Sequence, residues 1–589
     1  MPTTVAAATE LKERVEAKYP DIKFVLSGIV ALNNAFSTAA QKDMTTLVPV
    51  MYLVLLVTML LFLRSFLATV STLFVIAFSA AFAMGLAGWA GIRLTPPSVS
   101  ATTIILTLAI ADSIHIIVSM FKAMKAGMEK KEAIIESLRI NAQPVFLTSL
   151  TTIIGFLALN FSDAPPFHDL GNITAVGVAA AWVFSMLFLP AILSVLPITC
   201  KTCDVEEKGS MEKLGEFVIR SKRKLLYSIS ALIIFLAFMI PKMEIDDQWL
   251  QYFDYSIPFR ADAEFLIENL TGIYTMQYSI GASEANGVSE PEYLRHLESY
   301  VTWLRVQPEV AHVYSITDIF KRLNKNMHGD DPSWHRIPET REMAAQYLLL
   351  YEFSLPYGLD LTDRVNVDKS ATRVSVTLGG DASTRDIRAF KDRSEKWLRD
   401  NTPDYMNAEA TSPSVMFAYI ADRNIRGMMK GNIISLFLIS LIIMISLKSV
   451  RMGTISLIPN LVPPIMGFGL WALLIGQVNM AVALVTSISL GIIVDDTVHF
   501  LSKYNRAKRE KGFDDEAAVA YAFSTVGAAL VITTFILIFG FSVLAFSAFK
   551  MNSLMGLLTA VIIGCALFAD FFLLPPILML KKKKKESEL

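Results

Sequence analysis

Eleven long apolar segments, almost free of Lys, Arg, Asp and Glu, limit what this chain can fold into more than any other feature. A helix needs about 20 mostly apolar residues to cross the hydrocarbon core of a bilayer. Of the 589 residues, 53% are hydrophobic and only 18% are charged, which favours a polytopic membrane protein. We expect membrane helices near 46–63, 67–89, 98–121, 145–161, 171–197, 225–241, 431–447, 453–475, 480–501, 525–546 and 554–580.

Basic residues indicate the orientation of these helices. Lys and Arg are frequent in alternate connections, including 122–139 and 502–512, and in the tail that follows the last helix. Short loops rich in Lys and Arg stay in the cytoplasm. The C-terminus is therefore predicted to be cytoplasmic, and the N-terminus and the polar region 242–424 to lie outside. No secretory signal peptide precedes the first helix.

The two halves of the chain repeat each other. When "LAIADSIHIIVSMF" is compared with "GIIVDDTVHFLSKY" at an offset of 496 − 112 = 384, Asp112 pairs with Asp496 and His115 with His499. Many matches in one register indicate a duplication. Both halves run in the same direction across the membrane, which predicts a parallel repeat about an axis along the membrane normal. Further matches are Leu63-Arg64-Ser65 with Leu447-Lys448-Ser449 and, at an offset of 385, Gly155 with Gly540.

The second half has elements that the first half lacks. It opens with a helix and a large outside region, whereas only 45 residues precede the five helices of the first half. We expect an N-terminally truncated form of a twelve-helix protein; a natural eleven-helix protein is the alternative. The predicted parts are a remnant of a first outside domain (1–45), a first five-helix bundle (46–197), a cytoplasmic linker (198–224), a helix opening the second repeat (225–241), a second outside domain (242–424), a second five-helix bundle (425–580) and a basic tail (581–589).

The outside domain alternates strand-like and helix-like patterns. Residues 275–282, 372–380 and the stretch "VAHVYSIT" are expected to be strands, and Pro291 and Ser383 suit helix starts. The order of these patterns predicts an α+β, ferredoxin-like domain. In the N-terminal remnant, "LKERVEAKYP" has helical character and "DIKFVLSGI" resembles a strand. A loop, 324–339, contains His328, Asp330, Asp331 and His335, but their spacing fits no metal motif and favours a solvated loop.

Acidic residues within the apolar segments are the best candidates for function. Asp112, Asp495 and Asp496 together would cost on the order of 8 kcal/mol if they faced lipid, so they are expected to face the protein interior or a water-filled crevice. Helical spacing places His115 on the same face as Asp112, and both acids of the second half within reach of His499. Buried carboxyl and imidazole groups that face one another suit a proton relay. Hydrogen-bonded contact between helices is the alternative.

Other polar residues accompany these acids. Thr148-Ser149 matches Thr533-Thr534 in the repeat, and these hydroxyls either hold the acids or bond their own preceding turn. Asp570 is a further intramembrane acid, whose repeat mate is Ser185. Cys200 and Cys203 form a CxxC with no second Cys or His pair nearby, which favours incidental loop cysteines, and Cys565 is expected to serve packing.

These motifs resemble the resistance-nodulation-division (RND) superfamily. "GIIVDD" followed by "TVHF" resembles a motif of the fourth and tenth helices of that superfamily, and the chain looks closest to its MMPL-type branch, which includes hopanoid-type lipid exporters. The resemblance implies that Asp112, Asp495 and Asp496 couple protons to export. The first half departs from the motif, with Thr107 in place of the glycine and Ala111 in place of the first acid. The tenth helix also has no lysine at the position where multidrug members carry one.

The resemblance implies export of lipids or other hydrophobic or amphiphilic molecules across a bacterial inner membrane, with protons as the coupling ion. No cofactor, no metal, no enzymatic activity and no nucleic acid is expected. Membrane lipids, a homo-oligomer and periplasmic partner proteins are compatible with the family. Two other functions stay open. The five-helix block 46–197 also resembles the sterol-sensing unit of Patched-like proteins, which would suit a lipid sensor. A translocation accessory like SecD/SecF is the third.

Overall fold

The computed structural model describes residues 2–198, 209–245, 248–356, 358–380 and 382–580. They form two compact units. The membrane unit combines Phe36–Ile245 and Tyr252–Asp254 with the chain from Arg423 onward, and the sheet unit combines the chain up to Ala35 with Tyr255–Asp422. The predicted CxxC and the basic tail 581–589 lie outside the described residues.

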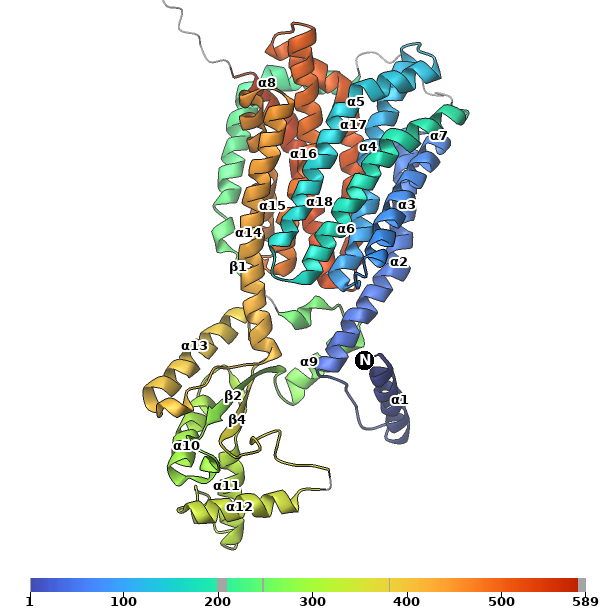
Figure 1. The fold of residues 1–589 in the computed structure, drawn as a ribbon. Helices are drawn as coiled ribbons and strands as arrows, with labels where there is room; N and C mark the ends of the chain where they lie inside the picture. The colour runs from blue at the N-terminus through green and yellow to red at the C-terminus, as the bar shows by residue number, and fades with distance from the viewer. Residues whose placement is uncertain (1, 199–208, 246–247, 357, 381, 581–589) are drawn as a thin grey trace, which may run out of the picture. The chain divides into compact units, whose positions relative to one another are not determined.

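Eleven helices in the described residues are long and apolar enough to cross a membrane, which confirms the predicted number (Figure 1). Five of them begin and end within about six residues of the predicted bounds, and each of the other six extends about 9 to 18 residues beyond the predicted bound at one end. They are α2 (Ile29–Leu63), α3 (Phe66–Trp89), α4 (Pro96–Lys125), α5 (Lys130–Leu157), α6 (Pro165–Val183) with its continuation α7 (Leu189–Val195), α8 (Ser210–Ala237), α14 (Pro413–Ser446), α15 (Val450–Leu474), α16 (Met480–Glu510), α17 (Asp515–Val543) and α18 (Lys550–Phe572) followed by α19 (Leu574–Leu578).

Helices α2 and α14 differ most from their predictions, because they begin at Ile29 and Pro413 rather than near residues 46 and 431. Gly28 has a φ of +103°, a conformation that glycine adopts without steric cost and that ends the preceding extended segment. From Ile29 to residue 45 the sequence contains neither Gly nor Pro, so nothing interrupts a helix there. The hydropathy of the sequence therefore predicts the apolar part of α2 correctly. The start of the helix is set by the backbone conformation at Gly28.

The sequence repeat is also visible in the backbone. Arg64 (φ 50°) and Lys448 (φ 48°) are repeat mates, and both adopt the left-handed conformation between two consecutive helices. The next residue in each half is a serine that caps the following helix: the Ser65 hydroxyl accepts from the backbone N–H of Ala68, and Ser449 does the same three residues on. Two turns with the same unusual conformation and cap support the duplication that the sequence predicts.

Helices α4 and α16 form the centre of the membrane unit (Figure 1). In their most apolar stretches 78% and 89% of residues are buried, against 11% in α8. Helix α16 packs closely against α5, where a Cβ atom built on Gly155 would lie 2.6 Å from the Cα atom of Gly491. Thr152 also donates a 2.6 Å hydrogen bond to the carbonyl oxygen of Gly491. Close contact between α5 and α16 therefore joins the first half of the chain to the second.

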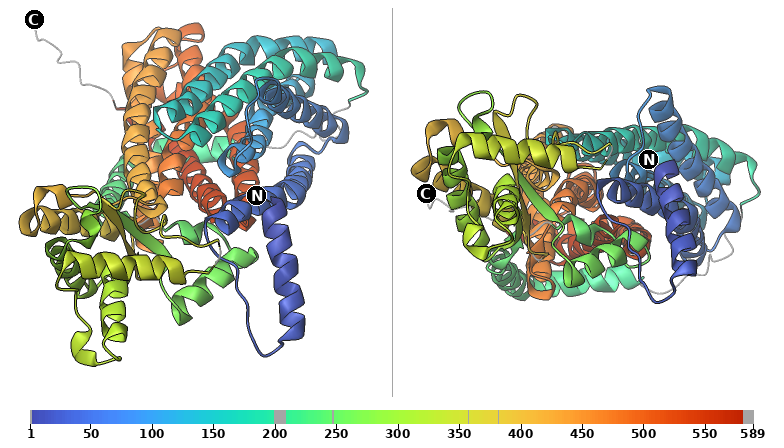
Figure 2. Two further views of the ribbon diagram at one scale, coloured as in Figure 1. Left: turned by 60° about the horizontal axis from the view of Figure 1, so that its bottom comes forward. Right: turned by 90° about the horizontal axis from the view of Figure 1, so that it is seen from below.

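The sheet unit is built on a three-stranded antiparallel sheet in the order β2 (Tyr274–Gly281), β4 (Ala371–Leu378), β3 (Val310–Tyr314). These are the three strands that the sequence predicts. A single bridge between Gln277 and Thr411 occupies the place of the fourth strand of a ferredoxin-like sheet. The helices of this unit are α1 (Pro2–Lys18), α9 (Pro258–Asn269), α10 (Pro291–Arg305), α11 (Ile316–Met327), α12 (Arg341–Ser354) and α13 (Thr384–Asn401) (Figure 2).

A separate hydrophobic core holds the sheet unit together. Alternate residues of β4 are buried, as the two-residue period predicts, and Tyr278 packs edge-on against Tyr300 from α10. Burial of the Tyr278 phenol raises its pKa to about 12. The predicted helix starts at Pro291 and Ser383 are confirmed. The strand predicted in "DIKFVLSGI" is wrong: residues 23–27 form no strand, because no neighbouring strand pairs with them in the described sheet.

Candidate functional site

The acids of the predicted relay lie on the two central helices of the membrane unit. Asp112 is on α4, and Asp495 and Asp496 are on α16; each is 6–8% exposed. His115 and His499 are 1% and 0% exposed. The structure therefore turns these ionisable side chains away from the outer surface of the bundle, as the cost of placing a charge in lipid requires.

One hydroxyl from the neighbouring helix binds an acid in each half. Ser149 on α5 donates a 3.0 Å hydrogen bond to Asp112, and Thr534 on α17 donates a 3.1 Å bond to Asp496. These two pairs are repeat mates. The preceding residue of each pair, Thr148 or Thr533, instead donates to the carbonyl oxygens of its own helix. Ser149 and Thr534 therefore bind acids, and Thr533 bonds its own preceding turn. Thr148 bonds its own turn and also lines the small cavity that Asp495 faces.

The two histidines stack on each other where the two halves meet. The ring centroids of His115 and His499 are 3.7 Å apart, and the ring planes differ by 6°. The Nε2 atom of His499 lies 3.5 Å from Oδ1 of Asp495, without the geometry of a hydrogen bond. Among the described residues, Nε2 of His115, both ring nitrogens of His499 and Oδ1 of Asp495 have no hydrogen-bond partner within the protein. Such unsatisfied buried atoms are costly and are common at functional sites.

Asp495 and Asp112 are connected by a small cavity. Both line a space of about 30 Å³, together with Thr148, Ser149 and Thr152 of α5. A cavity of this size and polarity can hold about one or two water molecules. Asp495 and Asp496 therefore have different surroundings: the former faces this cavity and His499, and the latter is bound by Thr534.

Asp570 occupies a second buried position beside the acids. Its Oδ1 accepts a 2.8 Å hydrogen bond from Thr497, which follows Asp496 on α16. The repeat mates of these two residues, Ser113 and Ser185, are 3.2 Å apart and make the equivalent contact in the first half. The second half therefore has a carboxyl group, that of Asp570, at the position where the first half has the hydroxyl of Ser185.

A metal ion is a further ligand that these side chains could take. His115, Asp495 and His499 each present a ligand atom, and the three atoms lie within 4.8 Å of one another. The two rings are nearly parallel, however, so their in-plane lone pairs run side by side rather than converge. Metal binding would require at least one ring to rotate, and the absence of a metal from this site stays a prediction.

The sequence analysis missed Lys503. It was assigned to a loop after a helix ending near residue 501, but α16 continues to Glu510 and Lys503 is 2% exposed. Its ammonium group donates a 3.1 Å hydrogen bond to the carbonyl oxygen of Ile140. The spacing of Asp495, His499 and Lys503, four residues each, places them along one face of a helix and could have indicated its burial.

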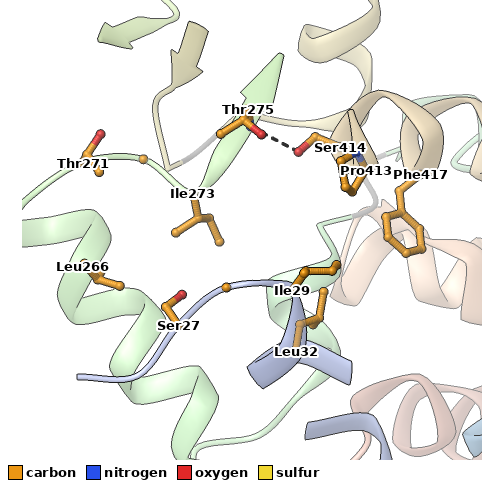
Figure 3. Close-up of a pocket in the computed structure, with 12 residues that line it drawn as sticks. Ser27, Ile29, Leu32, Leu266, Thr271, Ile273, Thr275, Pro413, Ser414 and Phe417 are labelled. Atoms are coloured by element: carbon orange, nitrogen blue, oxygen red, sulfur yellow. Dashed lines mark hydrogen bonds between the residues drawn. The ribbon is translucent and has the colours of Figure 1, made fainter. Parts of the chain in front are cut away.

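The sheet unit contains a separate, mostly apolar cavity. It has a volume of about 340 Å³ and lies between the segment before α2, helix α9, the start of β2 and the start of α14 (Figure 3). Figure 3 shows Ile29, Ile273 and Phe417 among its walls, with a hydrogen bond of 3.2 Å from the backbone N–H of Thr275 to Ser414 at one side. This volume lies in the range of small-molecule sites.

The loop 324–339 carries a stacked arrangement of rings and not a cluster of ligands. His328 stacks on Trp334 with centroids 3.6 Å apart, and the guanidinium of Arg336 lies over the same indole. The four polar residues named above form no group of metal-ligating side chains within the described chain.

A duplicated bundle of long helices, with acids in its two central helices and a separate α+β unit, defines the class as polytopic membrane proteins with an internal repeat. SecDF in its super-membrane-facing form has the same fold over 93% of this chain and 62% of its own, with a TM-score of 0.54 and 13% identity. The MMPL family matches residues 2–225 and 342–586. The chain therefore belongs to the MMPL family, and the predicted resemblance is confirmed.

Two curated proteins are also similar in sequence. The membrane protein MJ1562 of Methanocaldococcus jannaschii is 22% identical over 188 residues, which are 32% of this chain and 48% of that protein. The "Probable transport protein MmpL4" of Mycobacterium leprae is 30% identical over 181 residues, which are 30% of this chain and 19% of that protein. The matched segments span less than half the length of either relative.

Proposed function

We propose that this protein is a transporter that uses proton movement to export lipids or other hydrophobic molecules. The observation that carries the proposal is the pair of repeat-related acids, Asp112 and Asp496, each buried and each bound by one hydroxyl of the next helix. Each proton moved down a potential of 100 mV releases about 2.3 kcal/mol. A buried carboxyl group that alternates between its protonated and ionised forms can couple this energy to a change in helix packing.

The stacked histidines and the small cavity support a relay rather than a purely structural role. The cavity lined by Asp112 and Asp495 has room for water, and Asp495 lies beside His499. Two imidazolium ions 3.7 Å apart in a buried site would repel each other strongly, so the stack favours at most one proton. Together these groups form a continuous line of acceptors across the contact between the two halves.

The cavity of the sheet unit supports a hydrophobic cargo. Ile29, Leu32, Leu266, Ile273 and Phe417 supply most of its wall, and a few hydroxyls supply polar contacts. Apolar walls with a small number of polar groups are typical of sites for amphiphilic ligands. We place this unit in the periplasm and the C-terminus in the cytoplasm of a bacterial inner membrane. Protons are the only coupling ion in this proposal, and neither a cofactor nor an enzymatic step is part of it.

The test uses the full chain in proteoliposomes with an imposed pH gradient, a fluorescent lipid as cargo and a pH-sensitive dye inside. D112N and D496N, which keep the side-chain shape, are expected to abolish both lipid movement and the accompanying proton flux. D163N is the matched control, because Asp163 is an exposed partner of Arg423 in the same unit. Wild-type rates in D112N and D496N would contradict the proposal.

The same experiment separates the other functions. A lipid sensor would bind the fluorescent lipid in wild type and in D496N, without movement driven by the gradient in either. A translocation accessory, which the fold shared with SecDF makes a reasonable second candidate, would show proton flux without lipid movement. Homo-oligomers and periplasmic partner proteins remain compatible with the proposed export.

A further inference from the structure

A polar cavity at one end of the membrane unit collects positive charge. It has a volume of about 340 Å³ and lies between α5, the end of α14 and the last turns of α16. This end carries the α16–α17 connection, which the distribution of Lys and Arg predicts to be cytoplasmic. Five cations and one carboxylate line it: Arg139, Lys448, Lys503, Arg506, Arg509 and Glu510. We call this cavity the basic pocket.

Two of the five cations already have acidic partners. Arg139 makes hydrogen bonds of 2.7 and 2.8 Å to Glu136, and Arg506 makes one of 2.7 Å to Glu510. Within the described part of the chain, no carboxylate lies within 4 Å of the other three cations: Lys448, Lys503 and Arg509. The basic pocket therefore has an excess of positive charge that the protein leaves uncompensated.

Lys503 is the most unusual of these cations. It is 2% exposed, and its ammonium group, which has three N–H donors, has the carbonyl oxygen of Ile140 as its hydrogen-bond acceptor within the protein. A buried charge without a counter-ion is unfavourable, and a bound anion would remove that cost. Lys448 and Arg509 are exposed at the same pocket, so an anion could approach from solvent or from the membrane surface.

The internal repeat carries a different residue at the position of this lysine. The repeat mate of Lys503 is residue 503 − 384 = 119, which is Ser119 on α4. The first half therefore completes the corresponding turn with a small neutral side chain. Lys503 is buried beside two cations that have no carboxylate partner, and this supports a binding role. One of them, Arg509, donates to the carbonyl oxygens of Leu447 and Lys448, which holds its guanidinium at the basic pocket.

We propose that the basic pocket binds a phosphate group through Lys503, Lys448 and Arg509. Guanidinium and ammonium donors match the several acceptor oxygens of a phosphate, and Arg favours bidentate contacts. The phosphate belongs either to the headgroup of an anionic phospholipid or to a free phosphate compound, and the chemistry of recognition is the same. None of the three proposed ligand residues is one of the acids or histidines of the proposed relay, although Lys503 lies one turn beyond His499 on α16.

The test measures thermal unfolding of the purified full chain in a neutral detergent. One arm compares inorganic phosphate with chloride at equal ionic strength. The other compares mixed micelles containing phosphatidylglycerol with micelles containing phosphatidylcholine. A rise in the unfolding temperature in the first arm identifies a free phosphate ligand, and a rise in the second arm alone identifies a lipid headgroup; either supports the site.

The variant K503S, which copies the first half of the repeat, is expected to weaken binding at least about tenfold, since a charge-assisted hydrogen bond is lost. K503R should keep most of the affinity. K508S is the matched control, because Lys508 pairs with Asp515 and does not line the pocket. K448Q, at an exposed position, provides a second variant if K503S fails to fold. No rise in either arm, or an equal rise in wild type, K503S and K448Q, would overturn the proposal.

Discussion

At the scale of single residues, buried carboxylates in this protein have two different kinds of surroundings. Asp112 and Asp496 each accept one hydroxyl, whereas Asp43 on α2 accepts hydrogen bonds from the Ser547 hydroxyl, the Ala548 backbone N–H and the Asn552 amide. Three donors satisfy a carboxylate far better than one does. Asp43 is thus a structural residue, and the relay acids retain oxygen atoms that can exchange protons.

The role of Asp43 leads to a stability prediction. D43A should lower the free energy of unfolding by about 2 kcal/mol or more, because it leaves three buried donors without their charged acceptor. D163A removes an exposed ion pair with Arg423 and should cost at most about 1 kcal/mol. Denaturant unfolding in detergent micelles measures both. Equal effects of the two substitutions would assign Asp43 no special structural role.

At the scale of helices, the repeat explains why the two halves are similar but not identical. Gly540 packs against Thr107, whereas its mate Gly155 packs against Gly491, which is the repeat mate of Thr107. A glycine on both sides lets α5 and α16 approach more closely than a glycine facing a threonine allows. The same substitution of Thr for Gly was visible in the sequence as a departure from the family motif. Its consequence for packing became visible only with the neighbouring helix in place.

This contact predicts how added volume will be tolerated. G155A should destabilise the protein by about 1–3 kcal/mol, because the new methyl group would meet the backbone of Gly491 at 2.6 Å. G85A, in the last turns of α3 with no atom within 4 Å of the added Cβ, should be neutral or stabilise by up to about 1 kcal/mol. The unfolding temperatures of the two variants test this. If G155A is as stable as G85A, the helices are not in close contact there.

At the scale of the whole molecule, the chain divides into a unit that needs a bilayer and a unit with its own water-compatible core. The core of the sheet unit is formed by side chains of β2, β3, β4 and the helices α10 to α13. Its surface carries many ion pairs, such as Arg305 with Asp318 and Arg393 with Glu309. A self-contained core of this kind is what an independently folding domain requires.

We therefore expect residues 255–422, produced alone, to fold as a soluble domain. Circular dichroism should show mixed helix and strand, with one cooperative unfolding transition worth about 5–15 kcal/mol. V376D, which places a charge at a fully buried position of β4, should abolish this transition. V367D changes a valine that is 88% exposed, and the cooperative unfolding transition should remain. A non-cooperative wild-type fragment would show that the sheet unit depends on the rest of the chain.

The sequence by itself determined the eleven apolar helices, the duplication, the three strands and which acids of the apolar helices are buried. These follow from local hydropathy, from two- and four-residue periods and from the cost of a charge in lipid, none of which needs distant contacts. Only the tertiary structure decided that His115 stacks on His499, that Ser149 and Thr534 rather than Thr148 and Thr533 hold the acids, and that Lys503 is buried. These features depend on how helices from the two halves rotate and approach one another, and a sequence pattern records the spacing along one helix but not the helix that faces it.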